Sequence, residues 1–165
     1  MNHLYDLIRA RVPGADRPFA HLADGRRYSY GDVQDVSARF ANVLTGLGVE
    51  PGDRVAVQVE KSIEALMLYL ACVRAGAVFL PLNTAYTPPE VAYFLGDAEP
   101  RLFVCDPARK EALAPVAGVA RARVETLGVW SSPDRSAGTL AEAGLAAPAD
   151  FDNTPRGPDD LAAIL

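Results

Sequence analysis

The sequence predicts an α/β fold, with a mainly parallel sheet flanked by helices and preceded by a short N-terminal helix and a hairpin. Residues 54–82 read as a strand, a helix and a second strand, the pattern of a βαβ unit of about 30 residues with parallel strands. The pattern then repeats, because a helix start at Thr87 is followed by another apolar strand. We therefore expect strands at residues 54–59, 78–82 and 102–105 to be adjacent in one sheet.

Turn and cap residues predict the elements that precede this sheet. A short helix with one apolar face begins after Asn2. An Asp-Gly pair at residues 24–25 separates two stretches that read as short strands, at residues 19–23 and 26–28. Such a pair between two strands is a strong signal for a β-hairpin.

The later helices carry recognisable start and stop residues. Ser29, with an acidic residue three positions later, predicts a capped helix start, and Gly48 predicts its left-handed end. Ser62 begins a helix that is apolar almost all round, which predicts burial on several sides. Thr87 opens a capping box with proline at the first helical position. Two further elements are expected, a helix over residues 108–116 and a fourth strand over residues 124–127.

The C-terminal region is predicted to be mostly irregular. Residues 131–158 are rich in Pro, Gly, Ala and Asp, and indicate a loop with one short helix near Leu140. The apolar run at residues 159–165 resembles the start of a buried strand. The chain stops inside that run, so we interpret Leu165 as the boundary of a truncated piece.

Composition narrows the class of protein. Half of the 165 residues are hydrophobic and 22% are charged, as in soluble globular domains. The net charge of -5 argues against a nucleic-acid partner. No signal-peptide pattern opens the chain, and the longest apolar stretch, residues 65–73, is too short to span a bilayer. We therefore expect a cytoplasmic protein with no membrane partner.

The residue types that bind metals or act as nucleophiles do not form a recognisable sequence motif for a metal site or a catalytic site. The two histidines and two cysteines lie far apart in the sequence, so neither a zinc site nor a disulfide framework is predicted, and the cysteines are interpreted as core residues. Neither the phosphate-loop pattern GxxxxGK[ST] nor the nucleophile pattern GxSxG occurs. We predict no catalytic residue, no cofactor-binding residue and no metal ligand in this chain.

Two loops nevertheless follow strands where open parallel sheets usually bind ligands. One is residues 60–62, with Lys61, and the other is residues 83–87, with Asn83 and Tyr86. These three side chains could contact a ligand. We favour a structural interpretation, in which Ser62 and Thr87 are helix caps, Glu60 and Lys61 are solvated, and Asn83 and Tyr86 brace a turn.

Three blocks of sequence resemble the N-terminal region of adenylate-forming enzymes, the superfamily of acyl-CoA synthetases, luciferases and peptide-synthetase adenylation domains. The blocks are residues 28–33 (YSYGDV), 48–57 (GVEPGDRVAV) and 73–83 (VRAGAVFLPLN). They occur in the order and at the spacing of that superfamily, and the resemblance covers nearly the whole chain.

Finer features resemble malonyl-CoA synthetases. Asn83 stands where peptide-synthetase domains usually have Asp, which favours an acyl-CoA synthetase. Four further stretches are similar to the malonyl-CoA synthetase group, namely residues 57–62, 81–86, 93–100 and 160–165.

The resemblance implies that residues 1–165 are the N-terminal portion of the large adenylation domain, truncated before its phosphate-binding loop. The parent enzyme would use ATP, Mg²⁺ and coenzyme A to convert a carboxylate, malonate or methylmalonate, first to an acyl-adenylate and then to a thioester. No catalytic residue of the family maps onto this chain, so the fragment is expected to be inactive, to bind none of these cofactors, and to have the remainder of the same polypeptide as its partner.

Two other interpretations remain open. The chain could be a free-standing, non-catalytic α/β binding module, which the unfinished apolar run at its C-terminus disfavours. It could also belong to an amino-acid-activating adenylation domain, which Asn83 disfavours.

Overall fold

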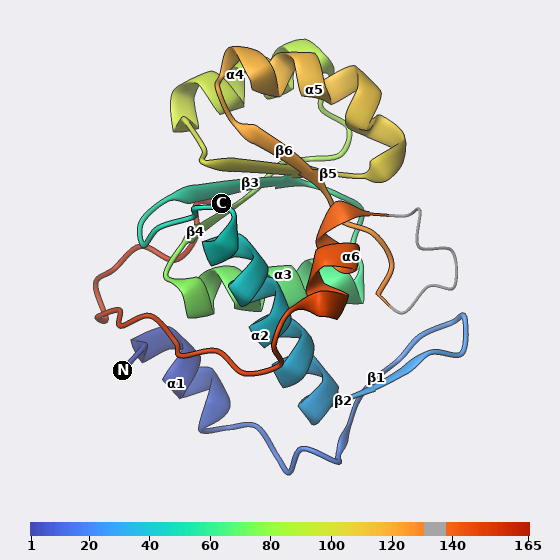
Figure 1. Cartoon of the computed structure of the whole chain (residues 1–165), viewed down its shortest axis with the longest axis vertical. Coiled ribbons are helices and arrows are strands. Elements are labelled where there is room, and N and C mark those ends of the chain that lie inside the picture. Colours follow the sequence, from blue (N-terminus) through green and yellow to red (C-terminus); the bar gives the residue numbers. More distant parts are fainter. Residues whose placement is uncertain (131–137) are drawn as a thin grey trace.

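The computed structural model describes residues 1–130 and 138–165, and shows one sheet with helices on both faces (Figure 1). Helix α1 (His3–Arg9) and an antiparallel hairpin of β1 (Pro18–His21) and β2 (Arg27–Ser29) come first, as predicted. The α/β part follows, in the order α2 (Tyr30–Gly46), β3 (Arg54–Gln58), α3 (Ile63–Ala75), β4 (Val78–Pro81), α4 (Pro88–Ala98), β5 (Leu102–Cys105), the 3₁₀ turn η1 (Pro107–Arg109), α5 (Lys110–Val119), β6 (Arg123–Thr126) and α6 (Thr139–Ala146).

The central sheet has four parallel strands in the order β4-β3-β5-β6. Val55 of β3 pairs with Phe79 of β4 on one side and with Leu102 of β5 on the other. This confirms the prediction that the first three strands are adjacent, and the fourth strand also forms. The strand ends differ from the predicted ones by about one residue, which is the usual uncertainty of an element boundary.

Strand residues alternate between two apolar layers. Val55 and Val57 of β3 pack with α2 and α3, and Figure 1 shows α6 on the same side. Ala56 of β3 and Phe103 of β5 point the other way and pack with α4 and α5. This period of two places a core on each face of the sheet, as expected for parallel strands covered by helices.

The predicted helix caps are in place. Ser29 Oγ accepts a hydrogen bond from the Asp32 amide at 3.1 Å, and the Asp32 carboxylate accepts one from the Ser29 amide at 2.7 Å. Ser62 Oγ accepts from the Ala65 amide at 3.1 Å, so Ser62 begins α3. Helix α3 has buried residues on several sides, which confirms the interpretation of its apolar pattern.

The prediction of a buried strand at the C-terminal end is wrong in one respect. Residues 162–164 do run parallel to the free edge of β4, because the Phe79 amide donates to the Ala162 carbonyl and the Ile164 amide donates to the Phe79 carbonyl, both at 3.0 Å. However, Leu161 is 54% exposed and Ile164 39% exposed. The backbone pairs with the sheet edge, but no layer of the described residues covers these side chains.

The predicted loop at residues 131–158 falls partly outside the described residues, and α6 is the short helix expected near Leu140.

Both cysteines are buried and unpaired, as the sequence analysis predicts. Burial raises the pKa of the Cys72 thiol, and burial followed by the nearby Asp106 charge raises that of Cys105 to about 11. Thiols protonated at neutral pH are poor nucleophiles, so both act as small apolar residues. Of the helices in the described part of the chain, none is long and apolar enough to cross a membrane.

Candidate functional site

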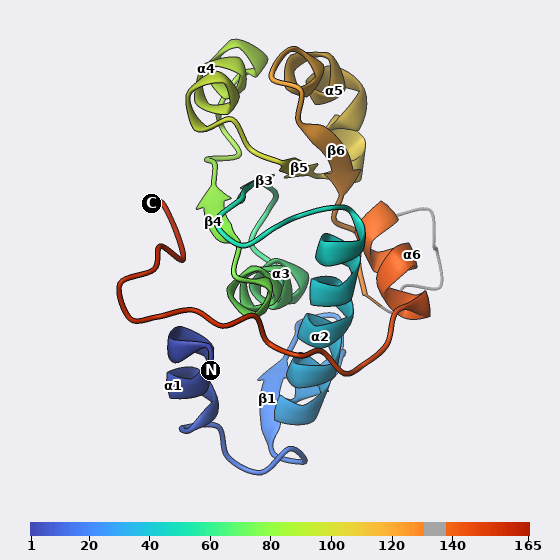
Figure 2. The ribbon, with the colours of Figure 1, turned by 60° about the vertical axis from the view of Figure 1, so that its left-hand side comes forward.

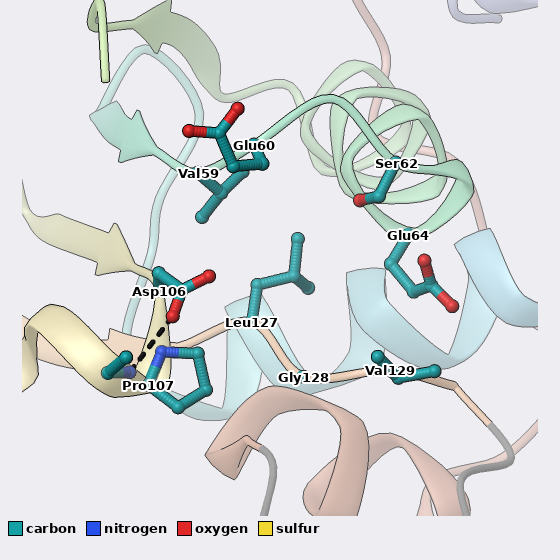
Figure 3. A pocket seen from close by; sticks show the side chains of 10 residues that line it. Val59, Glu60, Ser62, Glu64, Asp106, Pro107, Leu127, Gly128 and Val129 are labelled. Carbon is teal, nitrogen blue, oxygen red and sulfur yellow. Dashed lines mark hydrogen bonds between the residues drawn. The ribbon is translucent and has the colours of Figure 1, made fainter. Parts of the chain in front are cut away.

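A pocket of about 390 Å³ opens at the carboxyl ends of β3, β5 and β6. The chain leaves β3 for β4 on one side and later returns to β5 on the other, so the order of strands reverses between β3 and β5. Open α/β sheets usually bind ligands at such a switch point. The pocket is lined by Val59, Glu60, Ser62, Glu64, Asp106, Pro107, Ala108, Leu127, Gly128 and Val129, most of which Figure 3 labels.

The polar wall of this pocket is acidic. Its three carboxylates come from Glu60, Glu64 and Asp106 (Figure 3). Ser62 lies at the start of α3 and caps that helix. Asp106 Oδ1 likewise accepts a hydrogen bond from the Ala108 amide at 2.9 Å at the start of η1. At each of the two helix starts beside the pocket, one backbone amide is therefore already bonded to the cap side chain.

The pocket does not fit a nucleotide triphosphate. Phosphate sites need clustered backbone amides and cationic side chains, but the residues that line this pocket include no lysine or arginine. Within residues 1–130 and 138–165, no group of three or more His, Cys, Asp or Glu side chains is arranged to hold a metal ion. We therefore derive no chemistry with ATP or Mg²⁺ from these residues, and the absence of catalytic residues stays a prediction.

Glu64 is held by a network that joins three parts of the chain. Its Oε1 accepts a hydrogen bond from Arg26 in the hairpin at 2.6 Å and another from the Trp130 amide at 3.0 Å. Glu64 is only 2% exposed. Burial disfavours the charge of Arg26, but its hydrogen bonds to Glu64 and Asp24 outweigh that penalty and raise the pKa of the guanidinium. The network fixes the pocket wall after β6 to the hairpin and to α3.

The first loop that the sequence analysis singled out lies beside the pocket. Glu60 and Lys61 are exposed, as the solvated interpretation predicts. Glu60 lines the acidic pocket and also, together with Lys61, a neighbouring hollow of about 290 Å³ whose other residues are mainly apolar. Lys61 is not among the residues that line the acidic pocket, and any ligand contact by Lys61 remains a prediction.

The second loop supports its own turn. Asn83 Oδ1 accepts a hydrogen bond from the Ala85 amide at 2.9 Å, and the Tyr86 ring stacks on Phe94 of α4 with centroids 4.9 Å apart. Thr87 begins α4, and its amide and hydroxyl donate to the Glu90 carboxylate at 2.8 and 2.7 Å. These contacts agree with the structural interpretation of Asn83, Tyr86 and Thr87.

Two residues that hold this loop were not singled out from the sequence. Gln58, at the end of β3, is fully buried and donates from Nε2 to the Asn83 and Tyr86 carbonyls at 2.7 and 3.3 Å. Arg109 donates to the Thr84 and Tyr86 carbonyls at 2.8 and 3.2 Å. A polar residue that ends an apolar strand, as Gln58 does after three apolar residues, is the signal that could have found it.

Comparison with known proteins gives consistent matches. The sequence profile of the family described as AMP-binding enzyme matches residues 9–165. The crystal structure of ATP-bound MatB from Rhodopseudomonas palustris superposes on 99% of this chain and 32% of that chain, with a TM-score of 0.90 and 46% identity. Long-chain-fatty-acid–CoA ligase FadD13 of Mycobacterium tuberculosis is 32% identical over 170 residues, 100% of this chain and 32% of the ligase.

One further relative is named for a different activity. The AMB antimetabolite synthetase AmbB of Pseudomonas aeruginosa is 35% identical over 114 residues, which cover 69% of this chain and 9% of that protein. The chain therefore spans about a third of the length of FadD13 and of MatB, and a much smaller share of AmbB.

Proposed function

Since the chain belongs to the family of AMP-binding enzymes, we propose that it is the N-terminal portion of the large adenylation domain of an ATP-dependent acyl-CoA synthetase. The observation that carries this proposal is the superposition of nearly the whole chain on a third of ATP-bound MatB. The described residues also offer no site that fits a triphosphate, which agrees with a nucleotide site supplied by another part of a longer protein.

The proposed reaction has two steps. A substrate carboxylate attacks the α-phosphate of ATP, which gives an acyl-adenylate and pyrophosphate, and the thiol of coenzyme A then displaces AMP. Charge on the phosphates is neutralised by Mg²⁺ and by cationic and amide donors. All of these groups would belong to the sequence that follows Leu165, and we expect the enzyme to act in the cytoplasm.

We further propose malonate or methylmalonate as the substrate. The sequence resemblance to malonyl-CoA synthetases and the 46% identity with MatB, a protein of that group, support this choice. A dicarboxylate substrate needs a cation for its second carboxylate, and arginine suits it best because its guanidinium can bind a carboxylate through two hydrogen bonds. We expect this arginine in the remainder of the polypeptide.

Two other substrate classes are alternatives with an observation behind each. The identity with FadD13 over the full chain favours a longer acyl chain. The identity with AmbB keeps an amino-acid substrate open, although Asn83 disfavours it. A non-catalytic binding module is the weakest alternative, because the family match covers most of the chain.

The test uses the longer protein obtained by reading the coding sequence past Leu165. AMP release and thioester mass are measured with ATP, Mg²⁺, coenzyme A and a panel of malonate, methylmalonate, acetate, a long-chain fatty acid and an amino acid. We expect turnover on malonate or methylmalonate. Turnover on another member alone would reject the malonyl assignment and keep the synthetase, while a stop codon after Leu165 would contradict the proposal that this chain is a portion.

The isolated 165 residues provide the complementary test. Titration calorimetry with MgATP should show no binding, because no lysine or arginine lines the pocket at the carboxyl ends of the strands. Tight binding of MgATP by this chain would contradict the proposed location of the nucleotide site.

A further inference from the structure

Residues 147–160, which we name the strap, cross the molecule without forming a helix or a strand. The strap starts at the end of α6, passes over α2 and α3 beside the N-terminus of α1, and leads to the free edge of β4 (Figures 1 and 2). Residues 161–165, the edge segment, then run beside β4. An irregular chain can hold one register on a sheet edge only if something fixes it.

Arg74, in the last turn of α3, binds the strap through hydrogen bonds. Its Nε donates to the side-chain oxygen of Asn153 at 2.8 Å, and a terminal nitrogen donates to the Phe151 carbonyl at 3.4 Å. The guanidinium carbon lies 6.0 Å from the centre of the Phe151 ring. One side chain of α3 thus contacts two positions of the strap.

The other side of the guanidinium is anchored in the helical layer. Its second terminal nitrogen donates to the Gln34 carbonyl and to Ser37 Oγ, at 2.8 and 2.9 Å, and the group lies over the Tyr5 ring at 4.9 Å. Arg74 is only 7% exposed. A guanidinium is planar and its N–H donors point in fixed directions. Because the hydrogen bonds to α2 fix the orientation of the group, they also determine where the acceptors on the strap must lie.

Arg74 has no carboxylate partner within ion-pair distance among the described residues. Burial lowers the pKa of its guanidinium, but an arginine stays protonated at neutral pH. The charge is satisfied by carbonyl, hydroxyl and amide oxygens, two of which lie on the strap. Moving the strap would therefore leave a buried cation short of acceptors, which opposes any slip.

Two more contacts hold the next residues of the strap close to the end of α3. Asn2 Nδ2 donates to the Thr154 carbonyl at 2.9 Å, and the Thr154 amide donates to the Arg74 carbonyl at 2.8 Å. Gly76 has φ of +75°, and a Cβ there would lie 3.1 Å from side-chain atoms of both Thr154 and Arg156. A side chain at this position would therefore crowd the strap and strain the backbone.

From these contacts we infer that Arg74 is a positioning residue that sets the register of the edge segment on β4. The two bonds between Phe79 and the segment, at Ala162 and Ile164, follow the last strap contact of Arg74, at Thr154, by eight and ten residues. A slip of one residue would turn every side chain of the segment to the opposite face. The next consequence rests on the proposed function: in the longer protein, Arg74 sets where the chain after Leu165, and with it the ATP phosphates, lies.

Hydrogen exchange at single amides tests the register. Arg74→Met keeps a long apolar side chain and removes the hydrogen-bond donors. We expect hydrogen exchange at the Phe79 and Ile164 amides to accelerate about tenfold or more, because a hydrogen bond to a charged group is lost. The matched control is Arg39→Met, since Arg39 donates to the Leu145 carbonyl in α6 and to the Ala147 carbonyl at the start of the strap. The control should leave both amides unchanged.

Unchanged exchange in Arg74→Met, or acceleration spread evenly over all strands, would overturn the inference. If Arg74→Met does not fold, Asn153→Ala removes one acceptor from the half-buried strap and must accelerate the same two amides.

Kinetics of the longer protein test the second consequence. Arg74→Met should raise KM for ATP several-fold while KM for the carboxylate stays the same, and Arg39→Met should change neither. Localised exchange without a change in KM for ATP would overturn the link to ATP and keep the register. Absence of AMP release by the unsubstituted protein would instead contradict the proposed function.

Discussion

Gln58 Nε2 donates to the carbonyl oxygen of Asn83 at 2.7 Å, and so joins the end of β3 to the loop after β4 across 25 positions of sequence. The same nitrogen also reaches the Tyr86 carbonyl at 3.3 Å. The amide cannot be turned around, because its oxygen would then face two carbonyl oxygens. Gln58 Oε1 is buried and has no hydrogen-bond partner. This side chain is therefore a clamp with one unsatisfied acceptor.

The clamp predicts a stability loss for Gln58→Leu, which keeps the volume and removes the donor. We expect a decrease of about 1 to 3 kcal/mol in the free energy of unfolding, because the Asn83 carbonyl loses its short hydrogen bond to the buried Gln58 amide. Denaturant unfolding followed by circular dichroism measures it. Lys61→Ala, at an exposed residue three positions away, should change stability by less than about 0.5 kcal/mol. Equal values for the two variants would contradict the clamp.

Thr87→Ala should cost about 1 kcal/mol of stability, the usual loss for an N-cap residue. The hydroxyl and then the amide of Thr87 donate to Glu90 and lower the pKa of its carboxyl below 4.5. A lowered folded-state pKa gives stability that is present above the unfolded pKa and lost as pH falls through the folded value.

The difference between wild type and Thr87→Ala should therefore shrink on acidification below pH 4.5, as measured by denaturant unfolding at a series of pH values. A difference that is constant between neutral and acidic pH would show that the bond to Glu90 contributes nothing. No loss at neutral pH would mean that Thr87 is not the cap.

Local signals account for the parts of the fold that the sequence analysis predicted. Ser29 and Ser62 mark helix starts because a cap bonds an amide three residues away, and such spacing is visible in any sequence. The three predicted strands form because short continuous apolar runs suit parallel strands that helices cover on both faces. The family resemblance is likewise confirmed by the match to residues 9–165.

Long-range polar contacts could not be predicted in the same way. Glu64 lies in an apolar helix, and nothing in the sequence indicates that its partner is Arg26, 38 positions earlier. Arg74 likewise contacts Asn153 across 79 positions. The exposure of residues 161–165 could not be predicted either. Hydrophobicity indicates a preference for burial, whereas burial itself needs a layer of the protein that covers these side chains. The acidic pocket depends on the strand order, which no single motif reveals.

The network of Arg26 and Glu64 predicts a large effect for a single substitution. Arg26→Leu leaves the Glu64 carboxylate buried with only the Trp130 amide, and we expect a loss of about 2 to 3 kcal/mol. Adding Glu64→Gln should recover part of it, because a neutral amide needs no counter-ion. A double-mutant cycle by denaturant unfolding gives the coupling between the two residues. Additive effects of the two substitutions would show that the pair does not interact in solution.

The exposed side chains of the edge segment predict association of the isolated chain. Leu161 is 54% exposed, and the segment runs beside Phe79, which shares an apolar hollow with the exposed Leu66. Contiguous apolar surface above a few hundred Å² usually marks a contact with another chain or segment. Sedimentation velocity should therefore show association that rises with concentration, or thermal unfolding should show marginal stability.

Leu161→Lys should reduce that association, because it introduces a charge into the exposed apolar surface. The matched control is Val119→Lys at the end of α5, where the side chain is 86% exposed and far from the edge segment in the fold. If association depends on the edge segment, the control keeps the behaviour of the wild type. A monodisperse and highly stable wild-type chain, or equal effects of both lysine substitutions, would contradict the assignment of this edge as the surface that mediates self-association. Either result would also weaken the proposal that a further part of the polypeptide covers this edge.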